Sequence, residues 1–441
     1  MIRFEDMATG KAYPPASEAS RIKAVDDNRK LYEGDFRPLA LRRLGTLTQV
    51  RTDEGTTGTT PFDQVGMNFF RRVTNVYADF LFSEEVTLET GNPGMDATLA
   101  LLNAHLTDVM WAVNIDLQRF GVSVVTTDED QQYFRVISPD RWFPVHDDAG
   151  RLIGDITTEH VYGARDTAGT LAGDTLLVSP NVVQCQINDY GDSTRRIVRF
   201  AYDTKNLGEV LSETTVEIAE GVRQVAIIYN GYVEREQFGT SIFDDMREVV
   251  KSIIQSAGAL SGTIFYNSKP WMYGPPLKTM GGRTLTNVPF ERSKDAIIKN
   301  LQQQYIAVDG EQGERDPGFL QYEPNVDAQR FEHERNMTAL YTLTGLSPIL
   351  FESGANRNVI SGAAMRRLLI PFLSKLERMR RSNDELLLDM VTLWNAARAI
   401  IGGEVYSFSP ARFNVSWGYE RLFSDDVEPE PENTVALAEG A

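Results

Sequence analysis

The feature that most constrains this chain is one long helical pattern, residues 361–401, with a proline inside it. Apolar residues recur through the pattern at near-heptad spacing, which predicts a single amphipathic helix. At about 1.5 Å per residue such a helix would be roughly 60 Å long. Pro371 removes a backbone donor and clashes with the preceding turn, so we expect a kink around 367–371. The expected inward residues are Met365, Leu369, Phe372, Leu376, Met379, Leu386, Met390, Leu393 or Trp394, Ala397 and Ile400.

Two shorter helices and a small lobe precede this long helix. Residues 239–265 have helical apolar spacing, and residues 325–344 have it again. Between them, residues 266–324 contain most of the local Pro and Gly and one strand pattern, which predicts a small inserted lobe. A short polar loop, "SGANRN" (353–358), separates the second helix from the long one. The residues expected to face inward on the second helix are Phe331, Met337, Leu340 and Tyr341.

The first half of the chain predicts helices followed by an antiparallel sheet region. Helical patterns cover 17–33, 68–82 and 96–119, and a Gly/Thr-rich segment, 52–60, reads as a loop. From Gly121 to Ile228 the pattern changes to period two, with Gly, Asp and Asn turns between short strands. The fold class is therefore α+β. With 441 residues, the chain is expected to form about two to four domains or lobes.

The charge of the chain limits how it can handle nucleic acid. Its 62 acidic and 44 basic residues give a net charge of −18, which argues against nonspecific gripping of DNA through phosphates. A surface that lets DNA slide is still compatible with this charge. No apolar run is long enough to span a membrane, and the first residues lack a secretory h-region. Cys185 is alone, which excludes an internal disulfide and leaves reducing cytoplasm as the default compartment.

The sequence contains no recognisable catalytic or metal-binding pattern. There is neither a P-loop nor an H-E-x-x-H motif, and "DED" at 128–130 reads as a hairpin turn more readily than as a metal site. Cys185 lies in an apolar strand pattern and reads as a packed small hydrophobe. The four histidines, His105, His146, His160 and His333, are scattered. We therefore expect no catalytic, cofactor-binding or metal-binding residues, and no enzymatic activity.

Basic residues cluster on the long helix, and two interpretations of them stay open. They either form the solvated face of an amphipathic helix or face a partner or a phosphate. The residues are Arg366, Arg367, Lys375, Arg378, Arg380 and Arg381.

Several segments, in this order, resemble the portal proteins of tailed double-stranded DNA bacteriophages, which form the ring at the head-to-tail vertex. "NRKLYEGDF" (28–36) is similar to the family's early Asn…Tyr-x-Gly-Asp segment. Residues 68–90 are similar to its Asn-containing helix and the short strand that follows. Residues 238–254 are similar to its outgoing stem helix. "TGLSPILF…ISGAAMRRLL" (344–369) is similar to its turn before the kinked helix.

The resemblance implies a division of the chain into the parts of a portal subunit. It implies a ring, usually of twelve subunits, around a DNA channel. About forty residues follow the long helix, so a helical crown is expected to be short or absent. The implied parts are an α/β wing (1–239 and 361–424), a stem of two helices (240–265 and 325–346), a small α/β clip (266–324), a tunnel loop (347–360) and an acidic tail (425–441), which is expected to be disordered.

The resemblance also assigns roles to individual residues. In the tunnel loop, Ser353, Asn356, Arg357 and Asn358 would face the DNA channel, and Pro371 would be the helix kink. On the first stem helix, Met246, Val250, Ile253 and Ile254 would contact the neighbouring subunit, because the apolar stripe is wider than a two-helix hairpin covers. In the clip, Trp271 and Tyr273 would anchor an adaptor protein, and an ordinary local core is the alternative for these two aromatics.

The implied function is a conduit for packaging and ejection of double-stranded DNA, without sequence specificity and without cofactors. The implied partners are further copies of the chain, the major capsid protein, the large subunit of the terminase motor, and head-completion or adaptor proteins. The implied location is the portal vertex of the virion, with the host cytoplasm during assembly. Another head or neck component is the first alternative, and an enzyme with an unrecognised site is the second.

Overall fold

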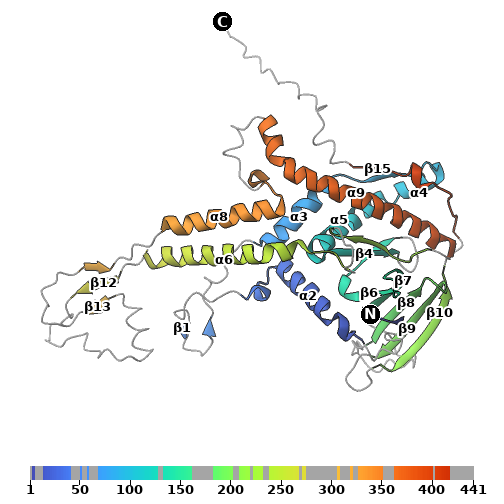
Figure 1. Cartoon of the computed structure of the whole chain (residues 1–441), viewed down its shortest axis with the longest axis horizontal. Helices are drawn as coiled ribbons and strands as arrows, with labels where there is room; N and C mark the ends of the chain where they lie inside the picture. Colours follow the sequence, from blue (N-terminus) through green and yellow to red (C-terminus); the bar gives the residue numbers. More distant parts are fainter. Residues whose placement is uncertain are drawn as a thin grey trace, which may run out of the picture. The chain divides into compact units, whose positions relative to one another are not determined.

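The chain contains both helices and antiparallel sheets, so it is an α+β protein, as the sequence predicts (Figure 1). The computed structural model describes residues 2–4, 13–40, 50–51, 57–58, 68–127, 133–160, 182–201, 208–218, 222–231, 238–267, 271–274, 305–307, 318–320, 326–350, 362–400 and 403–417.

The internal contacts divide the chain into two compact units. The larger unit consists of Met1–Pro38, Asn68–Met246 and Leu343–Ala441. The smaller unit consists of Leu39–Met67 and Arg247–Thr342. The boundaries expected for wing, stem, clip and tunnel loop stay predictions, because this division does not test them.

Two helices near the start of the larger unit contact each other through their ends. Helix α2, Ala19–Glu33, ends at Gly34, which has a left-handed φ of 91° that favours glycine. Helix α3, Phe69–Leu81, is capped by Asn68, whose side chain accepts from a first-turn amide. The Asn68 side chain also donates to the backbone carbonyl of Tyr32 at 2.8 Å. The two predicted helices are confirmed, and a hydrogen bond joins the two segments that contain the early motifs.

The helix predicted over 96–119 is wrong in one respect, because it consists of two helices. These are α4, Pro93–Ala100, and α5, Asn103–Phe120. The amides of Leu101 and Leu102 bond to carbonyls three residues back, at 3.3 and 2.8 Å, so the chain tightens into a turn between them. Leu101 is 85% exposed there. An apolar pattern that continues through both helices hides such a turn.

The antiparallel region predicted after Gly121 is confirmed and forms two sheets in the larger unit. One sheet has five strands in the order β10-β9-β8-β7-β6, and the other has three in the order β11-β4-β5 (Figure 1). All neighbouring strands in both are antiparallel. The strands are β4 Val122–Thr127, β5 Phe134–Ile137, β6 Trp142–His146, β7 Leu152–His160, β8 Val182–Asp189, β9 Thr194–Ala201, β10 Val210–Glu217 and β11 Ala226–Tyr229.

A proline explains how the chain passes from one sheet to the other. Within the period-two region, residues 133–148 contain β5 and β6, which belong to different sheets. Between these strands lies the 3₁₀ turn Pro139–Arg141. Pro139 begins this turn, and its lack of an amide to donate to a ladder favours the end of β5 here.

Two small sheets lie outside these two. Strand β3, Thr87–Glu89, pairs antiparallel with β15, Asn414–Ser416. Strand β1, Val50–Arg51, pairs with β2, Thr57–Gly58. The prediction that residues 52–60 are entirely loop is therefore wrong at β2.

The smaller unit contains most of two helices and a three-stranded sheet between them in sequence. Helix α6, Ile242–Asn267, and helix α8, Val326–Thr344, confirm the two predicted helices. Figure 1 draws them alongside each other, and Ser256 Oγ on α6 lies 3.2 Å from His333 Nδ1 on α8. The sheet has the order β13-β12-β14, with β12 Trp271–Gly274, β13 Tyr305–Ala307 and β14 Gly318–Leu320.

One inward prediction on α8 is wrong. Phe331 is 69% exposed, whereas Leu340 is buried at 1%. The polar side chains on both sides of Phe331 in sequence, Arg330 and Glu332, are also exposed. Apolar spacing alone therefore placed one residue too many on the covered side of this helix.

Helix α9, Gly362–Ile400, is the long helix of the sequence, and Pro371 lies inside it. Figure 1 draws α9 with a change of direction in its first part. The expected stripe is confirmed from Phe372 to Ala397, where every one of its members is buried. Leu369 is partly buried, and the side chains of Met365 and Ile400 lie outside the described residues.

Candidate functional site

The end of helix α8 is fixed by side chains from two other helices of the larger unit. The carbonyl of Thr344, the last residue of α8, accepts a hydrogen bond from the Tyr77 hydroxyl on α3. The same carbonyl lies 3.4 Å from Lys375 Nζ on α9. The Lys375 ammonium also lies 4.4 Å from the centre of the Tyr77 ring. Three helices therefore meet at one carbonyl, directly before the chain leaves α8.

Gly345 makes this exit possible. It has a φ of 71°, a left-handed conformation in which a Cβ atom is strained. A Cβ on Gly345 would lie 3.6 Å from the Tyr77 hydroxyl and 3.9 Å from the Pro371 carbonyl oxygen. The chain thus turns out of α8 against the part of α9 that contains its proline.

Aromatic side chains of α3 and α9 pack against each other at the same junction. The Phe372 ring lies 5.4 Å from the Tyr77 ring and 4.9 Å from the Phe80 ring. Phe372 and Tyr77 are both fully buried. Burial raises the pKa of the Tyr77 hydroxyl well above its usual value. We call Tyr77, Thr344, Gly345, Phe372 and Lys375 the α8 junction.

The segment that follows the junction contains the residues expected to face DNA. The chain forms a 3₁₀ turn, Pro348–Leu350, and α9 begins at Gly362. Ser353, Asn356, Arg357 and Asn358 lie outside the described residues, so their channel role stays a prediction.

The four residues expected to contact a neighbouring subunit on α6 are covered by the chain itself. Met246 and Val250 are fully buried, and Ile253 and Ile254 are 2% and 3% exposed. The expectation that another subunit covers this stripe is therefore wrong for these residues. A charge introduced at Ile253 would unfold the subunit at a cost of several kcal/mol, so it cannot test assembly.

Three apolar side chains beside the junction lack such cover. Leu343, at the end of α8, is 50% exposed, and Leu368 and Ile370, at the start of α9, are 50% and 56% exposed. All three belong to the larger unit. The sequence reasoning missed them, although a signal was present. Leu368 and Ile370 fall outside the heptad stripe that contains Leu369 and Phe372.

The two aromatic residues expected to anchor an adaptor lie on one strand of the small sheet. In β12 the backbone of Trp271 pairs with Leu320, and that of Tyr273 pairs with Gly318 and Ile306. Their side chains lie outside the described residues, so both the adaptor and the local-core interpretations stay open.

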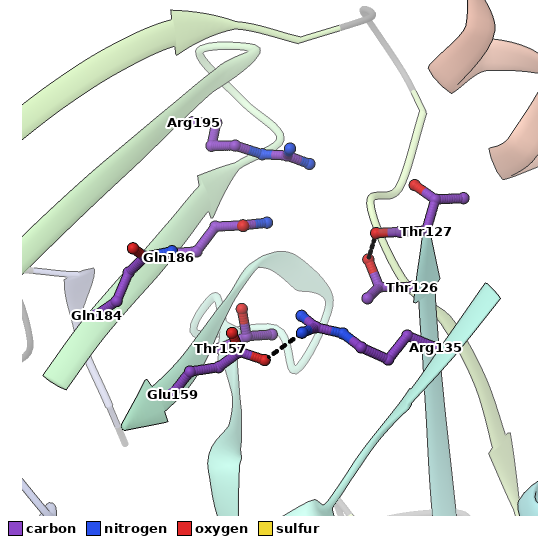
Figure 2. A pocket seen from close by; sticks show the side chains of 8 residues that line it. All are labelled: Thr126, Thr127, Arg135, Thr157, Glu159, Gln184, Gln186 and Arg195. Carbon is purple, nitrogen blue, oxygen red and sulfur yellow. Dashed lines mark hydrogen bonds and ion pairs between the residues drawn. The ribbon is translucent and has the colours of Figure 1, made fainter. Parts of the chain in front are cut away.

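A small polar cavity lies between the two main sheets of the larger unit (Figure 2). Its volume of about 40 Å³ leaves room for a few water molecules. Figure 2 shows the ion pair across it, in which Arg135 lies 2.6 Å from Glu159. The lining residues are Thr126, Thr127, Arg135, Thr157, Glu159, Gln184, Gln186 and Arg195.

A buried polar network continues from this cavity. Arg195 donates to Asn188 at 3.0 Å and to Gln224 at 2.6 Å. Asn188 and Tyr190 in turn donate to the fully buried carboxyl group of Asp155. Burial raises the pKa of Asp155 to about 6, although these hydrogen bonds oppose the rise. With its donors engaged in this way, the network is suited to joining strands and offers little to a ligand.

Nucleophile and metal chemistry find little support among the described residues. Cys185 is fully buried, and burial raises the pKa of its thiol to about 12, so it packs as a small hydrophobe as predicted. The described residues contain no group of three His, Cys, Asp or Glu side chains that could hold a metal ion. Within the same residues, no helix is both long and apolar enough to cross a membrane.

The basic residues of α9 divide between the two open interpretations. Arg380 and Arg381 pair with Glu377, which lies on the same helix, at 2.7 and 3.7 Å. Arg367 and Arg378 are exposed, and the side chain of Arg366 lies outside the described residues. Lys375 belongs to neither interpretation, because it binds the end of α8. Sequence spacing could not separate it from its exposed neighbours.

No model of a known protein family matches the chain, and no curated protein sequence matches it. Among solved structures, a chain in the virion of a native gene transfer agent particle is similar at 10% identity and a TM-score of 0.43, over 82% of this chain and 83% of that one. A neck chain of the empty particle, computed with C6 symmetry, is similar at 10% identity and a TM-score of 0.39, over 82% of this chain and 83% of that one. A neck chain of the native particle, computed with C12 symmetry, is similar at 10% identity and a TM-score of 0.37, over 79% of each chain. Similarities this weak assign neither a fold nor a function.

Proposed function

We propose that this chain is a subunit of a portal ring, which forms the channel for double-stranded DNA packaging and ejection at a phage capsid vertex. One observation supports this most strongly. Helix α6, the small sheet β12–β14, helix α8, a short segment and the proline-containing helix α9 follow one another in the order that the resemblance implies. The proposed ring has twelve subunits and no catalytic activity of its own.

In this proposal α6 and α8 form the stem, and residues 266–324 form the clip. Neighbouring subunits cover the apolar side chains that the single chain leaves exposed next to the α8 junction, Leu343, Leu368 and Ile370. These three replace the buried α6 residues as the subunit contact.

The charge around the loop fits a position beside DNA. Between Glu352 and Glu377 the sequence contains no acidic residue and four basic ones, although the whole chain has a net charge of −18. The four are Arg357, Arg366, Arg367 and Lys375, of which Lys375 binds the end of α8 and the other three carry the positive charge of this proposal. A few positive charges on otherwise acidic walls would guide a duplex without holding it, since strong holding needs many neutralised phosphates. In this proposal Ser353, Asn356, Arg357 and Asn358 face the DNA, and Arg357→Glu weakens retention of packaged DNA while rings still form.

The proposed partners follow from the position of the ring. The major capsid protein would surround it, and the large subunit of the terminase would dock on it during packaging and supply the ATP chemistry. Head-completion or adaptor proteins would replace the terminase, with Trp271 and Tyr273 of the clip as their anchors. The proposed location is the portal vertex of the virion, after assembly in the host cytoplasm.

Electron microscopy of the purified chain in negative stain tests this proposal. We expect rings with an axial hole. Compact single particles across a range of protein concentrations and salt would contradict it. Long open filaments would contradict it as well, because they would mean a contact that does not close.

A further inference from the structure

The α8 junction contains a positive charge in an unusual place. Lys375 is partly buried, and its ammonium group contacts a carbonyl oxygen and an aromatic ring. In the described part of the chain, no carboxylate lies within 4.0 Å of Lys375 Nζ. A buried cation ordinarily has a carboxylate partner, because its transfer from water is costly. The Lys375 amine instead contacts the end of a helix.

Each helix around Lys375 presents a group that acts on its charge. Helix α8 presents the Thr344 carbonyl, at the helix end where the dipole favours a cation. Helix α3 presents the Tyr77 ring and hydroxyl. Helix α6 presents Asp245, whose negative charge favours the protonated form, and α9 presents Arg378, whose positive charge opposes it. Burial outweighs the favourable groups and lowers the pKa of Lys375 to about 8.

The direction of the coupling follows from this environment. A Lys375 side chain that leaves the junction for water regains the ordinary pKa of a lysine, near 10.4. We call the junction closed when the Lys375 side chain lies in it and open when that side chain is in water. The Lys375 amine therefore binds a proton less tightly in the closed junction than in the open one. By linkage, loss of the proton favours the closed junction, and gain of the proton favours opening.

We propose that Lys375 is a proton-sensitive positioning residue. Together with Tyr77 it holds the Thr344 carbonyl and so fixes where the chain leaves α8 for residues 345–361. It holds this carbonyl more firmly when its amine is neutral. Tyr77 supplies a constant hydrogen bond, since burial keeps its hydroxyl protonated at any pH at which the protein is handled. Gly345 supplies the turn. Inside a ring this junction would set the position of the tunnel loop, and that consequence alone rests on the proposed function.

A spin label next to the junction measures this directly. Pro348 is exposed in the turn that follows it, and the natural cysteine, Cys185, is fully buried, so a label on Pro348→Cys is selective. In the otherwise unchanged protein we expect the mobile fraction of the label to stay level below a pH of about 8 and to fall as the pH rises toward about 10.4, the window between the pKa values of the amine inside and outside the junction. No pH dependence at this site would overturn the proposal.

Substitutions at Lys375 distinguish positioning from simple packing. Lys375→Met keeps much of the side-chain volume but cannot titrate, so we expect its profile to be flat. Lys375→Arg stays charged at every pH used, so we expect a mobile label throughout. Tyr77→Phe removes only the hydroxyl, and we expect higher mobility at every pH with the same pH window retained. A profile that persists in Lys375→Met would overturn the proposal.

A second label site and a second method complete the test. A label on Leu101→Cys, at the exposed turn between α4 and α5, serves as the control and is expected to show no change of mobility between a pH of about 8 and about 10.4. Hydrogen exchange of the Leu346 and Ser347 amides, corrected for intrinsic rates, replaces the label if Pro348→Cys disturbs the turn. If rings form but the pH profile is absent, the positioning role of Lys375 is contradicted and the proposed function is not. If the pH profile is present but rings do not form, the proposed function is contradicted and the positioning role of Lys375 is not.

Discussion

The two parts of α9, before and after Pro371, have different surroundings although they share one helix. After the proline, the side chains of Phe372, Leu376 and Met390 are buried, and α9 packs against α3, β4 and β11. Before it, Leu368 and Ile370 are at least half exposed. Among the described residues, Leu368 and Ile370 in the first part of α9 are therefore apolar side chains on which an outside partner would gain apolar burial.

Polar contacts show the same difference. In the second part, Asn383 and Asn114 of α5 exchange hydrogen bonds of 3.1 Å, and Asp384 accepts from the Trp417 indole at 2.8 Å. The contacts of Lys375 with Thr344 and Tyr77 lie one turn after the proline, at the start of the second part. The α8 junction thus lies at the boundary between the part of α9 that packs against other elements of the chain and the part with exposed apolar side chains.

The largest effect is expected at Phe372. Truncation by Phe372→Ala removes contacts with two aromatic rings in a fully buried site, so the free energy of unfolding should fall by about 3–5 kcal/mol. Denaturant unfolding followed by circular dichroism measures it. A loss below about 1 kcal/mol would mean that the second part of α9 is not packed as described.

Gly345 is expected to rank next. Gly345→Ala forces a Cβ atom into a left-handed conformation, which should cost about 1–2 kcal/mol of unfolding free energy. Gly150, which also has a positive φ but lies in open space at a hairpin turn, provides a matched control for backbone strain without the junction. If both alanine variants increase label mobility at Pro348→Cys equally, the turn at Gly345 does not act through the junction.

Replacement of the proline tests the boundary itself. Pro371→Ala restores a backbone donor inside a helix, so the free energy of unfolding should rise by about 1 kcal/mol. The first part of α9 should straighten, which misplaces the segment that precedes it. Heads assembled with this variant are expected to contain less full-length DNA, although rings form normally. Normal filled heads would mean that the kink has no role in packaging.

The smallest effect on the single chain is expected at the exposed residues. Ile370→Ser should change the free energy of unfolding by less than about 0.5 kcal/mol, because the side chain is 56% exposed. The same denaturant measurement as for Phe372→Ala applies, at a protein concentration where the chain is monomeric. A loss as large as that of Phe372→Ala would show that the first part of α9 is buried within the chain after all.

Periodicity predicted most of the helices because their stripes are covered by the same chain. The stripe from Phe372 to Ala397 and the capped start of α3 at Asn68 both follow local rules. Periodicity failed where tertiary contacts decide. It joined α4 to α5 across Leu102, and it placed Phe331 inward although no described part of the chain covers it.

The candidate site was harder to predict than the fold. Pro371 and the helix–lobe–helix order could be read from the sequence. The role of Lys375 could not, because six basic residues on one helix look alike until tertiary structure places one of them against the end of α8. The sequence places the subunit contact at Met246, Val250, Ile253 and Ile254 for the same reason. An apolar stripe does not indicate whether its own chain or another copy covers it.

The most direct test of the account combines Leu368→Glu and Ile370→Glu and measures assembly by native mass spectrometry. Because both side chains are exposed in the single chain, the monomer should keep its stability, and the ring should be lost when two charges per subunit enter the contact. Leu101→Glu, on a residue that is 85% exposed elsewhere in the larger unit, is the control and should leave the ring intact. Rings of unchanged size from the double variant would contradict the claim that neighbouring copies cover the first part of α9.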